Sequence, residues 1–172
     1  LSGITFSVAK DSYAKRWAES HGFAYVEREP AVVASGTCGE NLTWSLTSDG
    51  VLTLDGTGPM ATYYGEANIP WYANRALITT VNVGAGVTKL TTNAFCGCTN
   101  LETVNFAENS RLQMLGGSVF KSCTSLKSIT LPEGLTTISG NAFKYCRNLR
   151  NVYLPDTMSV IDNLAFTGLS GI

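Results

Sequence analysis

A phenylalanine recurs through the second half of the sequence at nearly constant spacing. Phe95, Phe120, Phe143 and Phe166 are separated by 25, 23 and 23 residues. Other columns keep the same register: Cys98, Cys123, Cys146 and Leu169; Leu90, Leu115, Ile138 and Ile161; Val87, Leu112, Leu135 and Met158; and, at 23, 25 and 23, Val81, Val104, Ile129 and Val152. A period between about 20 and 50 residues is typical of stacked repeats that complete one another's core. The sequence therefore predicts a solenoid, with two extra residues near 107–111 in a surface turn.

Each repeat unit has the composition of a short strand followed by two smaller segments. In residues 126–132, Ile129 and Leu131 alternate with polar side chains, which is the period of a half-buried strand. A second apolar segment follows at 135–138, and residues 141–146 leave room for about one turn of helix. One unit has too few apolar groups to fold alone, so we expect equivalent residues to stack about 4.8 Å apart in ladders.

The units resemble the BspA-like leucine-rich repeats of bacterial surface proteins, which read Leu-x-x-Ile-x-Leu-Pro, Leu-x-x-Ile and Ala-Phe-x-x-Cys. Residues 126–146 match this pattern almost throughout, and the resemblance covers four units in residues 77–172. It implies an α/β leucine-rich-repeat solenoid, predominantly β with short helical turns. It also implies an exported, extracellular or cell-surface protein with no shared catalytic activity.

The residues before the repeats have a different pattern. In residues 37–76, Leu42, Trp44 and Leu46 alternate with Ser and Thr before a Ser-Asp-Gly turn and two more alternating leucines. This pattern predicts a β-hairpin, which we expect to cap the first unit. Residues 1–29 predict a helix capped by Ser12 and then a strand, and they resemble the tail that closes a preceding domain. Residues 30–36, with Pro30, are predicted to be a linker in a longer parent protein.

The five cysteines and single histidine predict no metal, cofactor or catalytic site. Cys98, Cys123 and Cys146 occupy the same column as Leu169. We therefore expect each to be a small buried apolar group rather than a metal ligand or half of a disulfide. Cys38 and Cys96 lie outside that column, and the sequence leaves their burial open. Asp11, Ser12 and His21 are unsuited to a triad, because a helix would separate Ser12 from His21 by about 13 Å.

Composition excludes some partner classes. Hydrophobic residues make up 44% of the chain and charged residues 15%, with a formal net charge of -1. A disordered chain and a basic nucleic-acid binder are therefore not expected. Insertion into membrane is not expected either, because no apolar run approaches the roughly 18 to 20 residues needed to cross a bilayer.

The strand face that turns away from the core carries polar columns with few charges. The candidate binding residues on it are Glu102, Asn105, Lys127, Thr130, Arg150, Asn151 and Tyr153. Tyr153 and Arg150 are the expected anchors, because Tyr and Arg dominate binding hot spots. We therefore predict a non-enzymatic adhesion or host-interaction module that binds a host or bacterial surface protein or a glycan.

Two alternatives remain open from the sequence. In the first, the repeats serve only as a structural spacer that projects other domains. In the second, the chain is a carbohydrate-recognising accessory domain of a hydrolase, which requires that Tyr63, Tyr64, Trp71 and Tyr72 are exposed and stack on sugar rings.

Overall fold

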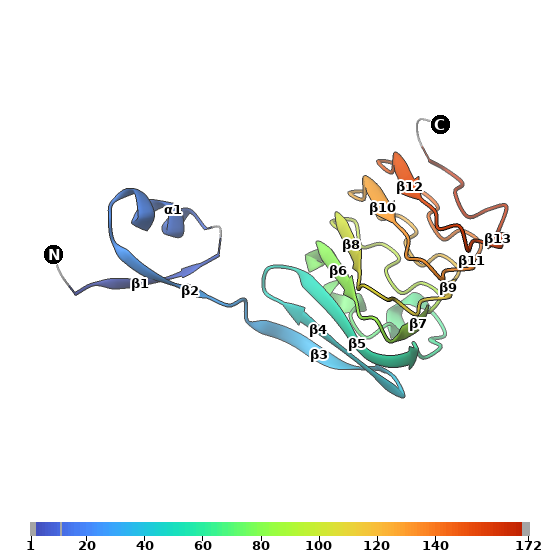
Figure 1. Cartoon of the computed structure of the whole chain (residues 1–172), viewed down its shortest axis with the longest axis horizontal. Coiled ribbons are helices and arrows are strands. Elements are labelled where there is room, and N and C mark those ends of the chain that lie inside the picture. Colours follow the sequence, from blue (N-terminus) through green and yellow to red (C-terminus); the bar gives the residue numbers. More distant parts are fainter. Residues whose placement is uncertain (1–2, 11, 170–172) are drawn as a thin grey trace. The chain divides into compact units, whose positions relative to one another are not determined.

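The chain folds as two compact units. A computed structural model describes residues 3–10 and 12–169 and divides the chain into Leu1–Val32 and Val33–Ile172. The first unit contains one helix and two strands, and the second contains the hairpin and the repeats (Figure 1). We describe each unit separately.

The first unit is a small β–α–β motif. Strands β1 (Thr5–Ala9) and β2 (Ala24–Arg28) pair in parallel, and helix α1 (Tyr13–Ser20) connects them. Trp17 of the helix packs against Phe6 and Phe23, with ring centroids 5.8 and 5.5 Å away. The helix and the second strand lie where the sequence predicts them.

The second unit begins inside the segment predicted to be a linker. Strand β3 (Val32–Gly39) lies next to β4 in the sheet, so the linker assignment of residues 30–36 is wrong from Val32 onward. Ala34 packs against the core of this unit, and Gly36 lies directly over Trp44. These packing contacts hold the segment in the sheet despite its weak alternation pattern.

The predicted hairpin is formed by β4 (Asn41–Thr47) and β5 (Val51–Pro59), which pair antiparallel. Gly50 closes the turn with a positive φ of 87°, and its N–H donates to the carbonyl of Thr47 over 3.0 Å. The first half of β5 pairs with β6 and its end pairs with β7. Strand β5 is thus the first strand of two rows of parallel strands, and the hairpin is also the cap of the repeats. Two 3-10 helices, Glu66–Asn68 and Tyr72–Leu77, connect it to the repeats.

The four repeat units each contribute one strand to each row (Figure 1). The first row contains β6 (Thr80–Val83), β8 (Thr103–Phe106), β10 (Ser128–Thr130) and β12 (Asn151–Tyr153). The second row contains β7 (Val87–Leu90), β9 (Met114–Leu115), β11 (Thr137–Ile138) and β13 (Val160–Ile161). The second row is hydrogen-bonded along its whole length.

The third side of each unit is a run of tight turns where the sequence predicts about one turn of helix. Asn93 and Asn141 begin equivalent turns with φ values of 62° and 59°, a region that asparagine tolerates better than most residues. The N–H groups of Phe95, Phe120 and Phe143 each donate over 2.8 Å to a carbonyl of the next unit. These bonds connect the units on the third side as the strands do on the other two.

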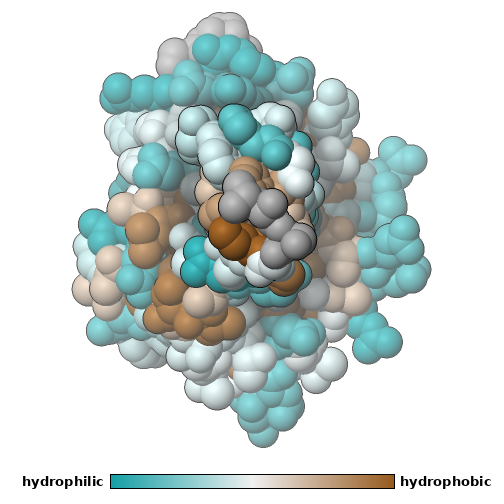
Figure 2. Space-filling view, turned by 90° about the vertical axis from the view of Figure 1, so that its left-hand side faces the viewer, coloured by the Kyte–Doolittle hydropathy of each residue, from teal (hydrophilic) through white to brown (hydrophobic). Residues whose placement is uncertain are grey.

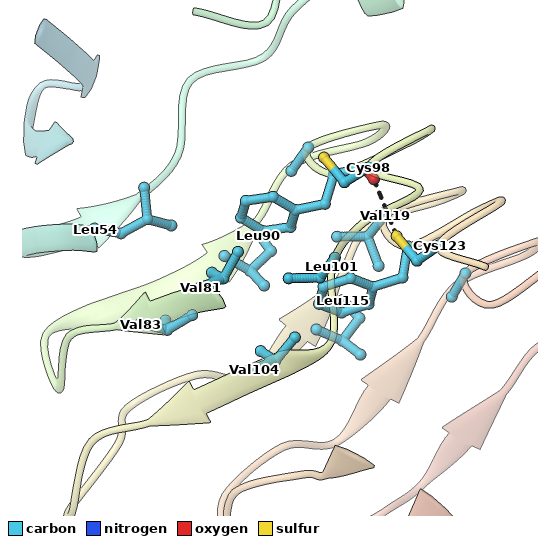
Figure 3. Packing of buried hydrophobic residues seen from close by; sticks show 14 of the residues in the cluster. Leu54, Val81, Val83, Leu90, Cys98, Leu101, Val104, Leu115, Val119 and Cys123 are labelled. Atoms are coloured by element: carbon cyan, nitrogen blue, oxygen red, sulfur yellow. Dashed lines mark hydrogen bonds between the residues drawn. The ribbon is translucent and has the colours of Figure 1, made fainter. Parts of the chain in front are cut away.

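The core is a continuous stack of aromatic rings. Phe95, Phe120, Phe143 and Phe166 follow one another with centroids 5.2 to 5.5 Å apart and ring planes within 20° of parallel. Trp71 continues the stack into the cap, 5.5 Å from Phe95. Leucine, valine and cysteine side chains surround the rings (Figure 3). The predicted phenylalanine ladder is confirmed.

Burial decreases in the last unit. Ile138 is fully buried, whereas its equivalent Ile161 is 44% exposed and the neighbouring Val160 is 53% exposed. Phe166, at the end of the stack, is only partly buried. The apolar edge of the array is therefore covered by the hairpin at one end and uncovered in the last described unit.

The molecular surface mixes hydrophilic and hydrophobic residues. In the space-filling view, apolar residues gather in patches separated by hydrophilic ones (Figure 2). Within residues 3–10 and 12–169, no helix has the length and hydrophobicity to cross a bilayer.

Candidate functional site

The seven candidate residues all lie on or beside the first strand row, and each is exposed. Glu102, Lys127 and Arg150 each immediately precede a strand of this row, and the remaining four lie within β8, β10 and β12. Strand register places Thr130 beside Tyr153, whose side chain is 59% exposed. The structure thus gathers the candidates on one face.

Two of the seven side chains are held by hydrogen bonds. The Asn105 amide donates to Oδ1 of Asn82 over 2.9 Å, which continues the polar column across β6 and β8. The Arg150 guanidinium donates to the carbonyl of Arg147 over 2.9 Å. This bond restrains the cation at the edge of the strand face.

The first row is interrupted between β8 and β10. Strand β8 pairs with β6, and β10 pairs with β12, but β8 and β10 do not pair with each other. The interruption adjoins the loop with the two extra residues, although the second row continues unbroken from β9 to β11. The column spacing indicates the two extra residues but not the absence of pairing between β8 and β10.

A groove of about 650 Å³ occupies the interruption. Its lining runs along β8 and β10 and into the loops that follow them, residues 102–110 and 128–133. Phe106 is half-buried in the lining and also borders a smaller hollow of about 290 Å³ between the ends of β5, β6 and β8. The strand face is therefore hollowed rather than flat.

The charged side chains that line the groove are all acidic. They are Glu102, Glu108 and Glu133, and each is exposed. Lys127 lies next to the lining residue Ser128, at the same strand ends as Glu102. The ion pairs of the described residues involve Lys15 and not these three glutamates. The charges within the lining are therefore all negative, and Lys127 and Arg111 are cations directly next to it in the chain.

The cysteine column consists of buried thiols in surroundings that lower their reactivity. Cys98, Cys123 and Cys146 are free thiols. The Sγ of Cys123 donates to the carbonyl of Phe95 in the preceding unit (Figure 3), and the Sγ of Cys146 donates to that of Phe120. Burial raises the pKa of Cys98 and of Cys146 to about 12, and that of Cys123 well above its usual value. Raised pKa values suppress the thiolate form that nucleophiles and metal ligands require.

The two cysteines whose burial the sequence left open are also buried and free. Burial raises the pKa of Cys38 to about 11. Burial, together with a hydrogen bond from Sγ to Glu66, raises the pKa of Cys96 to about 12. In the described part of the chain, no three histidine, cysteine or acidic side chains come together as metal ligands would.

The aromatic residues of the cap do not form a common sugar-stacking surface. Trp71 is only 1% exposed, and its indole N–H donates to the carbonyl of Ala94 over 2.7 Å. Tyr63 and Tyr72 pack partly against the core, and Tyr64 alone of the four is fully open, at 88% exposure. The sequence-based hypothesis that these four rings bind sugar together is contradicted by the burial of Trp71.

Ser12 and His21 have the structural roles predicted for them. The Ser12 side chain accepts from the N–H of Lys15 as the N-cap of α1. His21 is the C-cap residue, and its ring stacks on Trp17 with centroids 4.5 Å apart. Asp11 lies outside the described residues.

Comparison with protein families identifies the repeats. The sequence model described as "BspA type Leucine rich repeat region" matches residues 70–172 in six copies. The chain belongs to this family. The match begins seven residues before the predicted start at residue 77, and it divides into six copies the segment in which we count four structural units. Among curated proteins, no match was found.

Solved structures similar to this BspA-type chain are also leucine-rich repeat proteins. A protein from Eubacterium ventriosum ATCC 27560 is 24% identical, with a TM-score of 0.49 over 72% of this chain and 45% of its own. A leucine-rich cell surface protein from Faecalibacterium prausnitzii A2-165 is 23% identical, with a TM-score of 0.44 over 83% and 48%. The chain thus spans less than half the length of these two proteins.

Proposed function

We propose that this BspA-type chain is a non-enzymatic interaction module of a bacterial surface protein, and that its first strand row contacts a protein or glycan outside the cell. The supporting observation is the exposure of all seven candidate side chains on one side of a buried, stacked core. A rigid scaffold that presents polar and aromatic groups in fixed positions is suited to binding. The similarity to a leucine-rich cell surface protein supports the location.

The anchor residues of the proposal are Tyr153 and Arg150. Tyr153 exposes a large ring beside Thr130, and the backbone carbonyl of Arg147 restrains the Arg150 guanidinium. A restrained cation and an exposed aromatic ring lose little conformational freedom on binding, which favours affinity.

A double substitution tests this function. We expect Arg150→Ala with Tyr153→Ala to weaken binding to an array of host glycoproteins and glycans by more than about 1 kcal/mol, because truncated hot-spot residues cost at least that much. The melting temperature should change little, since both side chains are exposed. The matched control is Arg28→Ala with Tyr13→Ala, which removes the same residue types from the first unit. Unchanged binding by the strand-face variant would support the spacer alternative.

The carbohydrate-accessory alternative has less support, because Tyr64 is the one wide-open ring of the proposed four. Tyr64→Ala is its specific test. If this substitution abolished glycan binding while the strand-face pair had no effect, the binding site would lie on the cap.

A further inference from the structure

Basic side chains gather where the third side of the array leads into the first strand row. Two successive units contribute five of them, and we call this group the basic corner: Lys121, Lys127, Lys144, Arg147 and Arg150. Residues 121–128 and 144–151, which carry these cations, contain no acidic residue. The next acidic residues along the chain, Glu133 and Asp156, lie in the loops after β10 and β12, at a different corner of the units. The basic corner is therefore a local excess of positive charge on a chain whose net charge is -1.

The stacking of the units brings these cations together in pairs. Lys121 and Lys144 each follow a stacked phenylalanine, and the Ser122 N–H donates to the Lys144 carbonyl over 2.8 Å. Lys127 and Arg150 each precede a strand of the first row, and the Arg150 N–H donates to the Lys127 carbonyl over 2.9 Å. Neighbouring main chains in such a stack lie about 4.8 Å apart. Like charges at adjacent positions repel, so a ligand with several anionic groups would stabilise both pairs.

Within the protein, neutral groups rather than carboxylates hold these cations. None of the ion pairs between described residues includes a lysine of the basic corner or Arg150. The Arg150 guanidinium donates to the carbonyl of Arg147, and Nζ of Lys144 lies 5.1 Å from the ring of Tyr145. Both interactions restrain a side chain and leave its charge available to an anion.

The acidic residues nearest in the fold lie on the side of the cap. Glu102 occupies the column of Lys127 in the preceding unit, and Glu66 accepts from Sγ of Cys96, which occupies the column of Lys121. They limit the basic corner to the units that carry its five cations.

The surface between the cations is polar. Its exposed and half-buried side chains carry hydroxyl and amide groups, and they are Thr124, Ser125, Ser128, Asn148 and Asn151. The Asn148 amide donates to the Thr124 carbonyl over 2.7 Å, which fixes that side chain on the surface. Such groups suit the hydroxyls of a sugar, whereas an acidic peptide would need apolar pockets for its anchoring side chains.

We propose that the basic corner binds an acidic polysaccharide, whose sulfate or carboxylate groups pair with the cations while its hydroxyls contact the polar side chains between them. Arginine pairs with such anions through two parallel hydrogen bonds and lysine as a point charge. The proposal rests on the proposed function, for which it names the ligand class. It also extends the contact surface from the first strand row onto the third side.

Heparin, which carries sulfates, and polygalacturonate, which carries only carboxylates, are the probes, with dextran as the neutral control. We expect the whole chain to bind at least one of the two acidic polymers, with an affinity that falls as salt is added, and not to bind dextran. The polymer that binds identifies the anionic group. Polyglutamate of similar charge should bind about tenfold more weakly or less, because it has no hydroxyls to contact the polar side chains.

Charge reversal locates the site. Lys121→Glu with Lys144→Glu changes two residues outside the seven candidates of the strand face and should weaken binding of the acidic polymer about tenfold or more. Lys89→Glu with Arg111→Glu changes the net charge equally on other sides of the units and should weaken it less than about threefold. Neither pair is fully buried, so both variants should keep the melting temperature of the wild type.

Protection of lysine amines gives an independent location. Bound polymer should slow the acylation of Lys121, Lys127 and Lys144 and leave that of Lys89 unchanged, as read by peptide mass spectrometry. Attraction to the chain as a whole would slow all four alike.

Several results would overturn the proposal. They are the absence of binding by both acidic polymers, equally tight binding of polyglutamate, equal effects of the two charge reversals, and protection that maps to other lysines. If any of these is found while the Arg150 and Tyr153 substitutions still weaken binding to a surface partner, the polysaccharide proposal falls and the proposed function stands. If that double substitution also has no effect, both proposals fall.

Discussion

At the scale of single residues, the molecule depends on equivalent side chains that repeat the same contact. Phe143 illustrates this, because its buried ring lies between Phe120 and Phe166, with centroids 5.4 and 5.2 Å away. The following residue, Lys144, has an Nζ atom 5.1 Å from the Tyr145 ring and takes no part in the stack. Adjacent positions in the chain thus differ sharply in what they contribute.

Phe143→Ala should therefore be far more damaging than Lys144→Ala. Loss of a buried ring and the resulting cavity typically cost about 3 to 5 kcal/mol. The lysine change should cost less than about 1 kcal/mol, the range of an exposed cation–π contact. Urea unfolding of both variants measures the difference. Equal midpoints would contradict the central role of the stack.

The buried thiols predict how stability depends on pH. Their pKa values are raised in the folded protein, from a usual 9.0 to about 12 for Cys98 and Cys146. Above pH 9 the unfolded chain loses these protons more readily than the folded one, so the free energy of unfolding should fall as pH rises from 9 toward 12. Cys98→Ala with Cys146→Ala should flatten that decline. An equally steep decline in the variant would assign it to other groups.

At the scale of elements, the hairpin does more than shield an apolar edge. Strand β5 pairs with both β6 and β7, and Trp71 begins the ring stack, so the cap continues three ladders of the array. Gly56, with a φ of 107°, lies between the two pairing segments of β5, and a Cβ there would collide with the Asn41 carbonyl. The change of partner along β5 therefore requires glycine at this position.

Two substitutions at Trp71 separate its two contributions. Trp71→Phe keeps a ring on Phe95 but loses the hydrogen bond to Ala94, which should cost about 1 to 3 kcal/mol because a buried carbonyl loses its donor. Trp71→Ala also removes the ring and should cost about 3 to 5 kcal/mol. Thermal unfolding would rank the two variants against the wild type. A milder effect for alanine than for phenylalanine would be inconsistent with the stack extending into the cap.

Much of this architecture is predictable from sequence, for a physical reason. Phe95 and its equivalents recur in register because each must pack on the next, so the period itself records the core. The break between β8 and β10 leaves no such record, since Val104 and Ile129 are buried in their column whether or not their strands bond. The burial of Trp71 is likewise not predictable, because the sequence of an aromatic-rich loop does not indicate whether its rings face solvent or the core.

At the scale of the whole second unit, the two ends of the array differ in cover. The hairpin closes one end, while Val160, Ile161 and Leu164 are exposed at the other. In repeat proteins stability is approximately a sum of unit and neighbour terms, so the least covered unit should open first. The array should consequently unfold from the unit that contains Val160 toward the hairpin.

The cysteine column offers a way to time that directional opening. Successive units carry one buried thiol each at the same position, Cys98, Cys123 and Cys146, so the three differ mainly in distance from the open end. Under mild denaturant, a short pulse of thiol reagent followed by peptide mass spectrometry should modify Cys146 first and Cys98 last. Simultaneous modification would mean that the array opens as one cooperative block. The three buried thiols, which otherwise serve only in packing, would thus report the order in which successive repeats unfold.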